Sequence, residues 1–156
     1  MAAVDLETVI PAGASLLLDS SAVLAYLVGL ERTSPLAVQV LDGFVATGRN
    51  PAGISAVTVG EVLVRPFRTG PAAVAIAEGF LRHFAELEII AVDYPIARES
   101  ARIRALTGLR TPDALIVASA LVAGVDIVVT NDRSWPGAVA DVAPDLRVCR
   151  LDLLLE

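Results

Sequence analysis

Apolar residues follow two alternating patterns along this chain of 156 residues. Short apolar runs predict buried strands, whereas apolar residues at every third or fourth position predict helices. The runs place strands at 15–18, 51–55, 87–92, 126–130 and 146–149. The helical spacing places helices at 22–28, 34–48, 57–67, 71–84, 95–106 and 111–124. Because strands alternate with helices and no hairpin turns separate them, the pattern predicts an α/β fold with a mostly parallel sheet.

Proline and capping residues set the expected limits of several helices. Ser34 and Pro35 form a helix-start signature, and Pro66 is expected to end its helix. Thr111 is the expected cap of the last helix, which should be the central buried one because it is apolar almost all round. We expect an irregular leader, a single domain and a short tail, at residues 1–14, 15–150 and 151–156.

Composition indicates a folded domain in a reducing compartment. The chain is 55% hydrophobic and only 19% charged, which argues against disorder. No apolar run reaches the roughly 20 residues of a membrane span, and the first 14 residues do not resemble a secretory signal. A single cysteine, Cys149, excludes an internal disulfide framework, so we expect a cytoplasmic protein with no membrane association.

The basic residues exclude several kinds of chemistry. All twelve lysine-or-arginine positions are arginine, so P-loops and Schiff-base lysines are absent from the sequence. The one histidine, His83, cannot form a multi-histidine metal site, and a partly exposed helical position is its expected role. Any chemistry must therefore depend on carboxylates, hydroxyls and arginines. The net charge of −6 is not that of a general nucleic-acid binder.

Four acidic residues stand at comparable places in the predicted elements. Asp19 and Asp132 follow apolar strands, whereas Glu61 and Asp113 lie in early turns of helices. Such positions share one edge of a parallel sheet, where the strands have their carboxyl ends. Each acid also has an ordinary interpretation: a helix cap for Asp19, a capping box with Thr58 for Glu61, a favourable helix dipole for Asp113 and a turn for Asp132.

Four carboxylates brought together would repel one another unless protons or a cation relieved the repulsion. A site with only oxygen ligands favours Mg²⁺ or Mn²⁺ over zinc. Such an ion lowers the pKa of a bound water molecule and clamps a phosphodiester for in-line displacement. Together, the acids therefore indicate metal-assisted hydrolysis more strongly than any one of them does.

Four segments resemble the PIN-domain nucleases and, among them, the VapC-type toxins of bacterial toxin–antitoxin pairs. These segments are Leu17-Leu18-Asp19-Ser20-Ser21-Ala22-Val23-Leu24, Ser55-Ala56-Val57-Thr58-Val59-Gly60-Glu61-Val62-Leu63, Thr111-Pro112-Asp113-Ala114-Leu115-Ile116-Val117-Ala118 and Val128-Val129-Thr130-Asn131-Asp132. The resemblance extends over about residues 16–149. It implies a three-layer α/β/α fold with about five strands, and a Mg²⁺-dependent endoribonuclease in a cytoplasmic homodimer inhibited by a small antitoxin.

The resemblance also implies roles for individual residues. The family's acidic quartet falls on Asp19, Glu61, Asp113 and Asp132, of which Asp19, Asp113 and Asp132 would hold the metal. Glu61 would orient or deprotonate the attacking water. Candidates to support the acids, by proximity in sequence, are Ser20, Thr111 and Asn131. Candidates to bind RNA phosphates are Arg65, Arg68, Arg98 and Arg102, although solvated or ion-paired arginines are an equally open interpretation.

Three alternatives compete with this interpretation. A haloacid-dehalogenase-like phosphatase needs an acid two residues after Asp19, and that position is Ser21. A structure-specific DNA nuclease of the same fold would look the same in sequence. A non-catalytic PIN-like binding module would lack one of the four acids, and none is lacking.

Asp126 is expected to have only a local role because it begins its strand and so lies at the opposite edge of the sheet.

Overall fold

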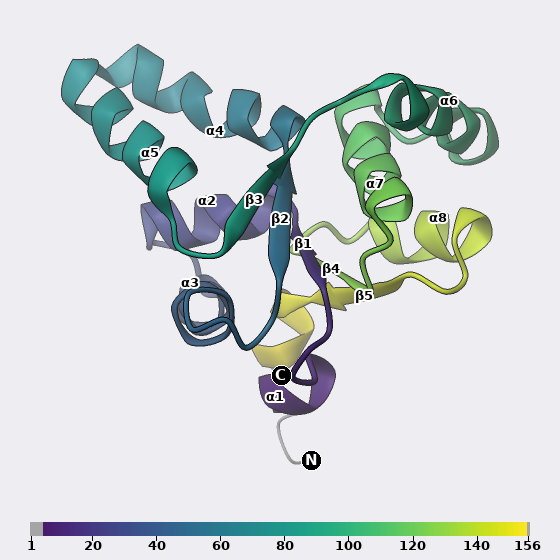
Figure 1. Ribbon diagram of the computed structural model, residues 1–156, viewed down its shortest axis with the longest axis horizontal. Coiled ribbons are helices and arrows are strands. Elements are labelled where there is room, and N and C mark those ends of the chain that lie inside the picture. The colour runs from purple at the N-terminus through teal and green to yellow at the C-terminus, as the bar shows by residue number, and fades with distance from the viewer. Residues whose placement is uncertain (1–4, 156) are drawn as a thin grey trace.

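A five-stranded, all-parallel sheet forms the centre of the computed structural model, which describes residues 5–155 (Figure 1). The strand order is β3-β2-β1-β4-β5. The register pairs Leu17 of β1 with Gly53 of β2 on one side and with Val128 of β4 on the other. The strand bounds are β1 Leu16–Leu18, β2 Ala52–Ser55, β3 Leu87–Ile90, β4 Ile127–Thr130 and β5 Arg147–Arg150. The predicted parallel α/β fold is confirmed.

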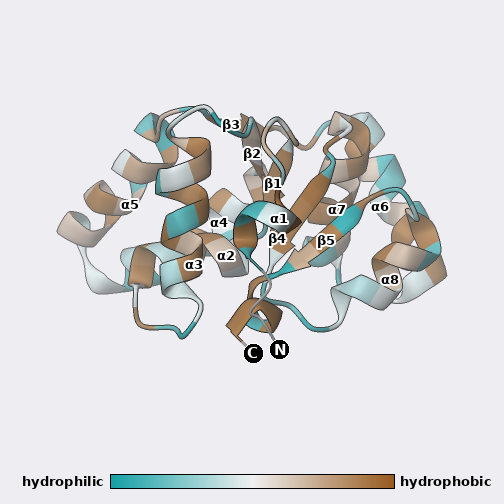
Figure 2. Cartoon of the chain, turned by 90° about the horizontal axis from the view of Figure 1, so that it is seen from below, coloured by the Kyte–Doolittle hydropathy of each residue, from teal (hydrophilic) through white to brown (hydrophobic). Residues whose placement is uncertain are grey.

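Helices cover both faces of the sheet and make three layers, which Figure 2 shows from below. One layer contains α2 Ser20–Val28, α3 Ser34–Val38, α4 Ala56–Thr69 and α5 Pro71–His83. The other contains α6 Tyr94–Thr107, α7 Thr111–Ala123 and α8 Trp135–Val142. Helix α3 continues into a π-helix at Gln39–Val45, so the single helix expected at 34–48 is divided into two kinds of turn.

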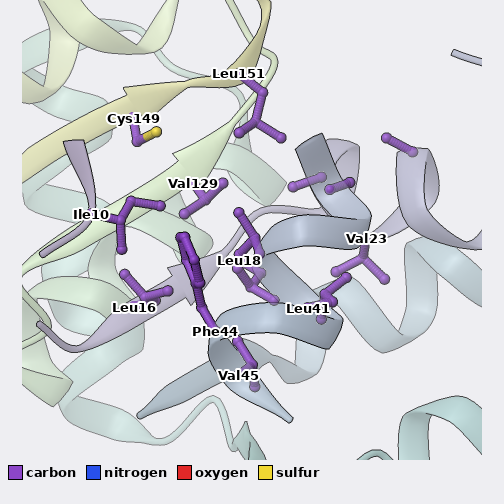
Figure 3. Packing of buried hydrophobic residues seen from close by; sticks show 14 of the residues in the cluster. Ile10, Leu16, Leu18, Val23, Leu41, Phe44, Val45, Val129, Cys149 and Leu151 are labelled. Atoms are coloured by element: carbon purple, nitrogen blue, oxygen red, sulfur yellow. The ribbon is translucent and has the colours of Figure 1, made fainter. Parts of the chain in front are cut away.

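Strand β1 shows how the sequence pattern separates two cores. Side chains of a strand alternate between its faces. Leu16 and Leu18 pack with Ile10 and Phe44 in the layer of α2 to α5 (Figure 3). Leu17 points the other way, into a second core that contains the buried residues of α7. All three leucines are buried, which explains why β1 has an uninterrupted apolar run.

The leader contains a short helix and belongs to the core, so the expectation of an irregular segment was wrong for the residues described. Helix α1 covers Leu6–Val9, and the Asp5 side chain caps it by accepting a hydrogen bond from the backbone of Glu7 at 3.3 Å. Leu6 and Ile10 are buried in the first core. A one-turn helix is too short to show a helical period. Residues 1–4 lie outside the described part of the chain.

Three helix limits differ from those expected. Helix α4 continues past Pro66 to Thr69, because a proline in the last turn costs only one of the helix's hydrogen bonds. Helix α7 begins at Thr111 with Arg110 as its cap residue, so Thr111 is not the cap. Helix α8 was not predicted; its first residue, Trp135, is fully buried in the second core. The tail forms a 3₁₀-helix at Leu151–Leu155.

No single helix within residues 5–155 is both long enough and apolar enough to cross a membrane. Helices α6 and α7 pass that test of length and composition only as a pair, and they meet at a bend of 119°.

Candidate active site

The four predicted acids line one open pocket at the carboxyl ends of the central strands. Asp19 directly follows β1, and Asp132 lies two residues beyond β4. Glu61 comes from the second turn of α4, and Asp113 from the first turn of α7. The parallel sheet thus brings together residues that are up to 113 positions apart, as the sequence pattern predicted.

Asp19 is the most buried of these acids, with an exposed fraction of 5%. Its Oδ2 accepts hydrogen bonds from Ser21 Oγ at 2.7 Å and from Thr130 Oγ1 at 2.8 Å. The pKa of Asp19 is raised above its ordinary value, mainly because the carboxyl group is buried. The two hydroxyl bonds oppose this shift, and the charge of Glu61 adds to it. Asp19 occupies the cap position of α2 but makes no side-chain capping bond, so its ordinary interpretation fails.

The two hydroxyls that hold Asp19 are themselves fixed by the backbone after β4. Ser21 Oγ accepts from the Asn131 N–H at 2.9 Å, and Thr130 Oγ1 accepts from the Asp132 N–H at 2.9 Å. Sequence reasoning missed both Ser21 and Thr130 as supports of the site. The available signal was a hydroxyl at the end of a buried strand, since a buried polar group needs a partner.

Glu61 is held by the hydroxyl of Ser20, which donates to its Oε2. The oxygen of Ser20 also lies 3.0 Å from that of Thr58. The capping-box interpretation of Glu61 is wrong, because Ser55 caps α4 and accepts from the Val57 N–H at 3.2 Å. The side chain of Ser20 therefore supports Glu61, while its backbone interacts with Asp19, the acid beside it in sequence.

Asp113 shares the pocket with Arg110, a residue that sequence reasoning missed. Arg110 Nε lies 3.5 Å from Asp113 Oδ2, and 85% of the arginine side chain is exposed. The pKa of Asp113 is raised above its ordinary value, mainly because of burial. Arg110 opposes this shift, and the charges of Asp132 and Asp19 add to it. These charge interactions show that the carboxylates are close enough to influence one another. The spacing of three residues on a helix was the available signal for Arg110.

Asp132 combines a place in the pocket with the turn role of its ordinary interpretation. Its Oδ1 accepts from the backbone N–H of Ser134 at 2.8 Å and from the Ser134 hydroxyl at 2.7 Å. Both bonds go to the same oxygen. The turn thus fixes the carboxylate before α8 begins.

The other two residues predicted to support the acids are Thr111 and Asn131, and in the described part of the chain neither of them, unlike Ser20, has a side chain that bonds to an acid of the pocket. Thr111 is the exposed first residue of α7, and within residues 5–155 its side chain makes no hydrogen bond. The Asn131 side chain donates to Thr33 Oγ1 at 3.1 Å and lines a neighbouring pocket. Its Oδ1 is buried and has no hydrogen-bond partner among the described residues. Only the backbone of Asn131 supports the acidic pocket.

The four predicted RNA-binding arginines are not brought together. Arg65 and Arg68 are exposed on α4, four and seven residues after Glu61, and so share its helix face. Arg98 is exposed on α6. Arg102 is bonded to Glu99 and donates to the Val142 carbonyl at 3.2 Å, which matches the ion-paired interpretation.

Asp126 has the local role that was expected of it. Its Oδ2 accepts from both the backbone N–H and the hydroxyl of Ser15, at 2.9 and 3.0 Å. These bonds join the starts of β1 and β4, at the edge opposite the acidic pocket.

The acidic pocket fits a hard divalent cation by the chemistry of its donors. Carboxylate oxygens from four elements face it, no sulfur or imidazole of the described residues does, and the carboxylates raise one another's pKa. Within residues 5–155, no three acidic, histidine or cysteine side chains already stand close enough to form a complete metal site. The chemistry of the donors, more than their present spacing, supports a cation at this pocket.

Comparisons with known proteins agree with this architecture. No curated protein sequence matches the chain. A toxin–antitoxin complex from Klebsiella pneumoniae has a chain that is 23% identical, with a TM-score of 0.64 over 88% of this chain and 98% of that one. VapC20 from Mycobacterium tuberculosis, a sarcin–ricin loop cleaving toxin, is 16% identical, with a TM-score of 0.64 over 80% and 95%.

A further similar structure is VapBC2 from Rickettsia felis bound to a DNA fragment from its promoter, at 16% identity and a TM-score of 0.63 over 86% of this chain and 97% of that chain. These likenesses concern the fold. The family model described as the PIN domain matches residues 16–139, which include all four acids and all but the last strand of the sheet. The chain therefore belongs to the PIN domain family.

Proposed function

We propose that this protein is a Mg²⁺-dependent endoribonuclease, with Mn²⁺ as a possible substitute, and the VapC-type toxin of a type II toxin–antitoxin pair. The observation that carries the proposal is the convergence of Asp19, Glu61, Asp113 and Asp132 on one pocket. Membership of the PIN domain family supports a nuclease. The similar structures described as toxins or toxin–antitoxin complexes support the biological role.

Asp19, Asp113 and Asp132 would hold the cation. When bound, a divalent cation polarises the phosphodiester and lowers the pKa of a water molecule. Ser21 and Thr130 direct one oxygen of Asp19 toward the protein, and Ser134 does the same for Asp132. The carboxylates are thus oriented before substrate binds, which reduces the reorganisation needed in the transition state.

Glu61 would act on the attacking water. Because Ser20 donates to Oε2, the carboxylate is held in one orientation at the pocket. In the proposed step, Glu61 accepts a proton while the water oxygen bonds to phosphorus and the bond to the leaving oxygen breaks. The leaving oxygen is then protonated by solvent. The presence of all four acids favours catalysis over a non-catalytic binding module.

Arg65 and Arg68 are the best placed of the four arginines to bind RNA, since they extend the helix face that carries Glu61. Arg98 lies on a different helix, and Arg102 is already bonded. On a chain with a net charge of −6, a homodimer would pool such arginines along a shared groove.

The proposal includes a small antitoxin and a second copy of the chain as partners in the cytoplasm. The similar structures that are toxin–antitoxin complexes support the antitoxin as a partner. Copurification of the chain with the product of an adjacent small gene, followed by measurement of the mass of the complex, tests both partners.

The activity is tested by incubating RNA and DNA of the same sequence with the protein, in Mg²⁺ or in excess chelator. We expect RNA cleavage in Mg²⁺ only, with a loss of at least about 100-fold in Asp19→Asn, because removing a preorganised charge from such a site costs that much. Asp145→Asn is the control, because Asp145 is an exposed acid in the loop before β5, at the opposite edge of the sheet from the pocket. Preferred cleavage of DNA would favour the DNA nuclease, and equal activity of wild type and Asp19→Asn would refute the assignment.

A further inference from the structure

A second pocket lies directly beside the acidic one. Its walls come from the loop before α3, the loop after β4 and the 3₁₀-helix at Leu151–Leu155. Asp132 lines the acidic pocket, while the residues on either side of it, Asn131 and Arg133, line the second one. The two sites are therefore neighbours along the carboxyl edge of the sheet. We call the second one the polar pocket; it is lined by Glu31, Arg32, Thr33, Asn131, Arg133, Asp152 and Leu155.

Two arginines at the polar pocket have guanidinium groups that are free to take a new anion. Arg32 is exposed, and within residues 5–155 its side chain has neither a salt bridge nor a hydrogen bond. Arg133 Nε forms a long ion pair with Asp152 Oδ2, at 3.5 Å, and 84% of the arginine side chain is exposed. An exposed pair of this kind contributes little, so Arg133 can exchange its partner.

Asp152 does not depend on Arg133 for its neutralisation. Arg150 donates to both oxygens of the Asp152 carboxylate, at 3.1 and 2.5 Å, in the forked geometry that makes such pairs strong. The acid therefore stays paired if Arg133 turns toward a ligand. Glu31 is the remaining acid on the pocket, and Arg32 and Arg133 together outweigh it.

We propose that the polar pocket is the subsite for the RNA backbone next to the scissile bond, with Arg32 and Arg133 binding its phosphates. This inference rests on the proposed nuclease function. An RNA strand held at the acidic pocket must continue past it, and the carboxylates there repel its neighbouring phosphates. Two arginines one pocket away offset that repulsion. Neither of them was among the arginines expected from the sequence.

The amide of Asn131 gives the polar pocket a wall that is fixed to the active site. Its backbone donates to Ser21, which in turn holds Asp19, while its side chain donates to Thr33. A strand bound at the polar pocket is thus set at a fixed distance from the reacting centre. An acidic protein segment would need no fixed distance from the site of cleavage, so this arrangement favours RNA as the ligand.

The test measures RNA binding in an Asp19→Asn background, in which the strand is not cut. Arg32→Gln, Arg133→Gln and the double variant are compared by fluorescence anisotropy over a range of salt concentrations. Arg147→Gln is the matched control, because Arg147 is exposed at the start of β5, on the opposite edge of the sheet. Circular dichroism checks that each variant is folded.

We expect each polar-pocket substitution to weaken binding several-fold and to reduce the salt slope by about 0.7, the value for one phosphate contact on a single strand. The double variant should show the sum, and Arg147→Gln should match its background. RNA affinity of the double variant equal to that of Arg147→Gln would overturn the inference, even if binding to an acidic partner protein fell.

The failure of this inference can be distinguished from that of the proposed function. If wild type cuts RNA but the double variant binds it as tightly as the control, only the polar-pocket subsite is wrong. If wild type neither binds nor cuts RNA, the nuclease proposal and the inference both fall.

Discussion

Hydroxyl groups fix the carboxylates of the acidic pocket at the scale of single residues. Ser21 and Thr130 both donate to one oxygen of Asp19, and Ser20 donates to Glu61. An acid buried as deeply as Asp19 needs such donors, because an unsatisfied charge in the interior is costly. The serines after Asp19 therefore do more than begin a helix: they connect β1 to α4 and β4.

Thr130→Val tests this arrangement with almost no change in shape. We expect a loss of about 1 to 3 kcal/mol in the free energy of unfolding, because the buried Asp19 oxygen loses one of its donors. RNA cleavage should fall as well, since the carboxylate is less firmly oriented. Urea denaturation and a cleavage assay measure the two effects.

Thr47→Val is the control for Thr130→Val, since Thr47 is an exposed threonine before β2, and its hydroxyl bonds only to the neighbouring residues Gly43, Phe44 and Arg49. A Thr130→Val protein with the stability and the activity of Thr47→Val would show that the hydroxyl is not needed.

The elements of this fold differ in how much of them the sequence reveals. Strands β1 and β4 and helix α7 are evident because they are apolar and lie in the interior. Helix α1 is hidden by its length. Helix α8 is hidden because Trp135 and Pro136, which follow a turn, resemble a loop more than a helix start. Tertiary contacts decide such short elements, and a single sequence does not display them.

Asp126→Asn tests how the starts of β1 and β4 are joined. The bonds from Ser15 lower the pKa of Asp126, so this carboxylate contributes stability above its unfolded pKa of about 3.9 and loses it as the pH falls through the lower folded pKa. We expect Asp126→Asn to be less stable than wild type at pH 7 and the difference to shrink in acid.

Denaturation midpoints at pH 7 and at about pH 2.5 measure this difference, with Asp145→Asn as the control for removal of an exposed acid. If the difference between Asp126→Asn and wild type stayed constant with pH, the hydrogen bonds from Ser15 would stabilise the fold independently of the charge on Asp126.

At the scale of the whole molecule, the topology converts four distant acids into one pocket. The sequence predicts this convergence because parallel strands have all their carboxyl ends at one edge. It does not predict Arg110 or the polar pocket, because their neighbours depend on how loops cross that edge. The four acids follow from strand ends and from the early turns of helices, whereas the residues that hold and surround them depend on tertiary packing.

The burial and mutual repulsion of the four carboxylates have a cost in the stability of the entire domain. Burial and mutual repulsion raise the pKa values of Asp19 and Asp113, so the folded protein should gain stability when a cation binds. A ligand of the native state stabilises it by about 2.7 kcal/mol at 100 times its Kd. We expect Mg²⁺ to raise the melting temperature of wild type more than NaCl of equal ionic strength does.

Asp113→Asn should remove most of this specific gain, because it takes away one ligand and part of the repulsion, while Asp145→Asn should keep it. Differential scanning calorimetry in Mg²⁺, in matched NaCl and in chelator separates cation binding from general screening, which acts on all surface charges alike. Equal melting temperatures of wild type in Mg²⁺ and in matched NaCl would mean that the folded pocket does not bind the ion. The four acids would then need substrate phosphates to complete a metal site.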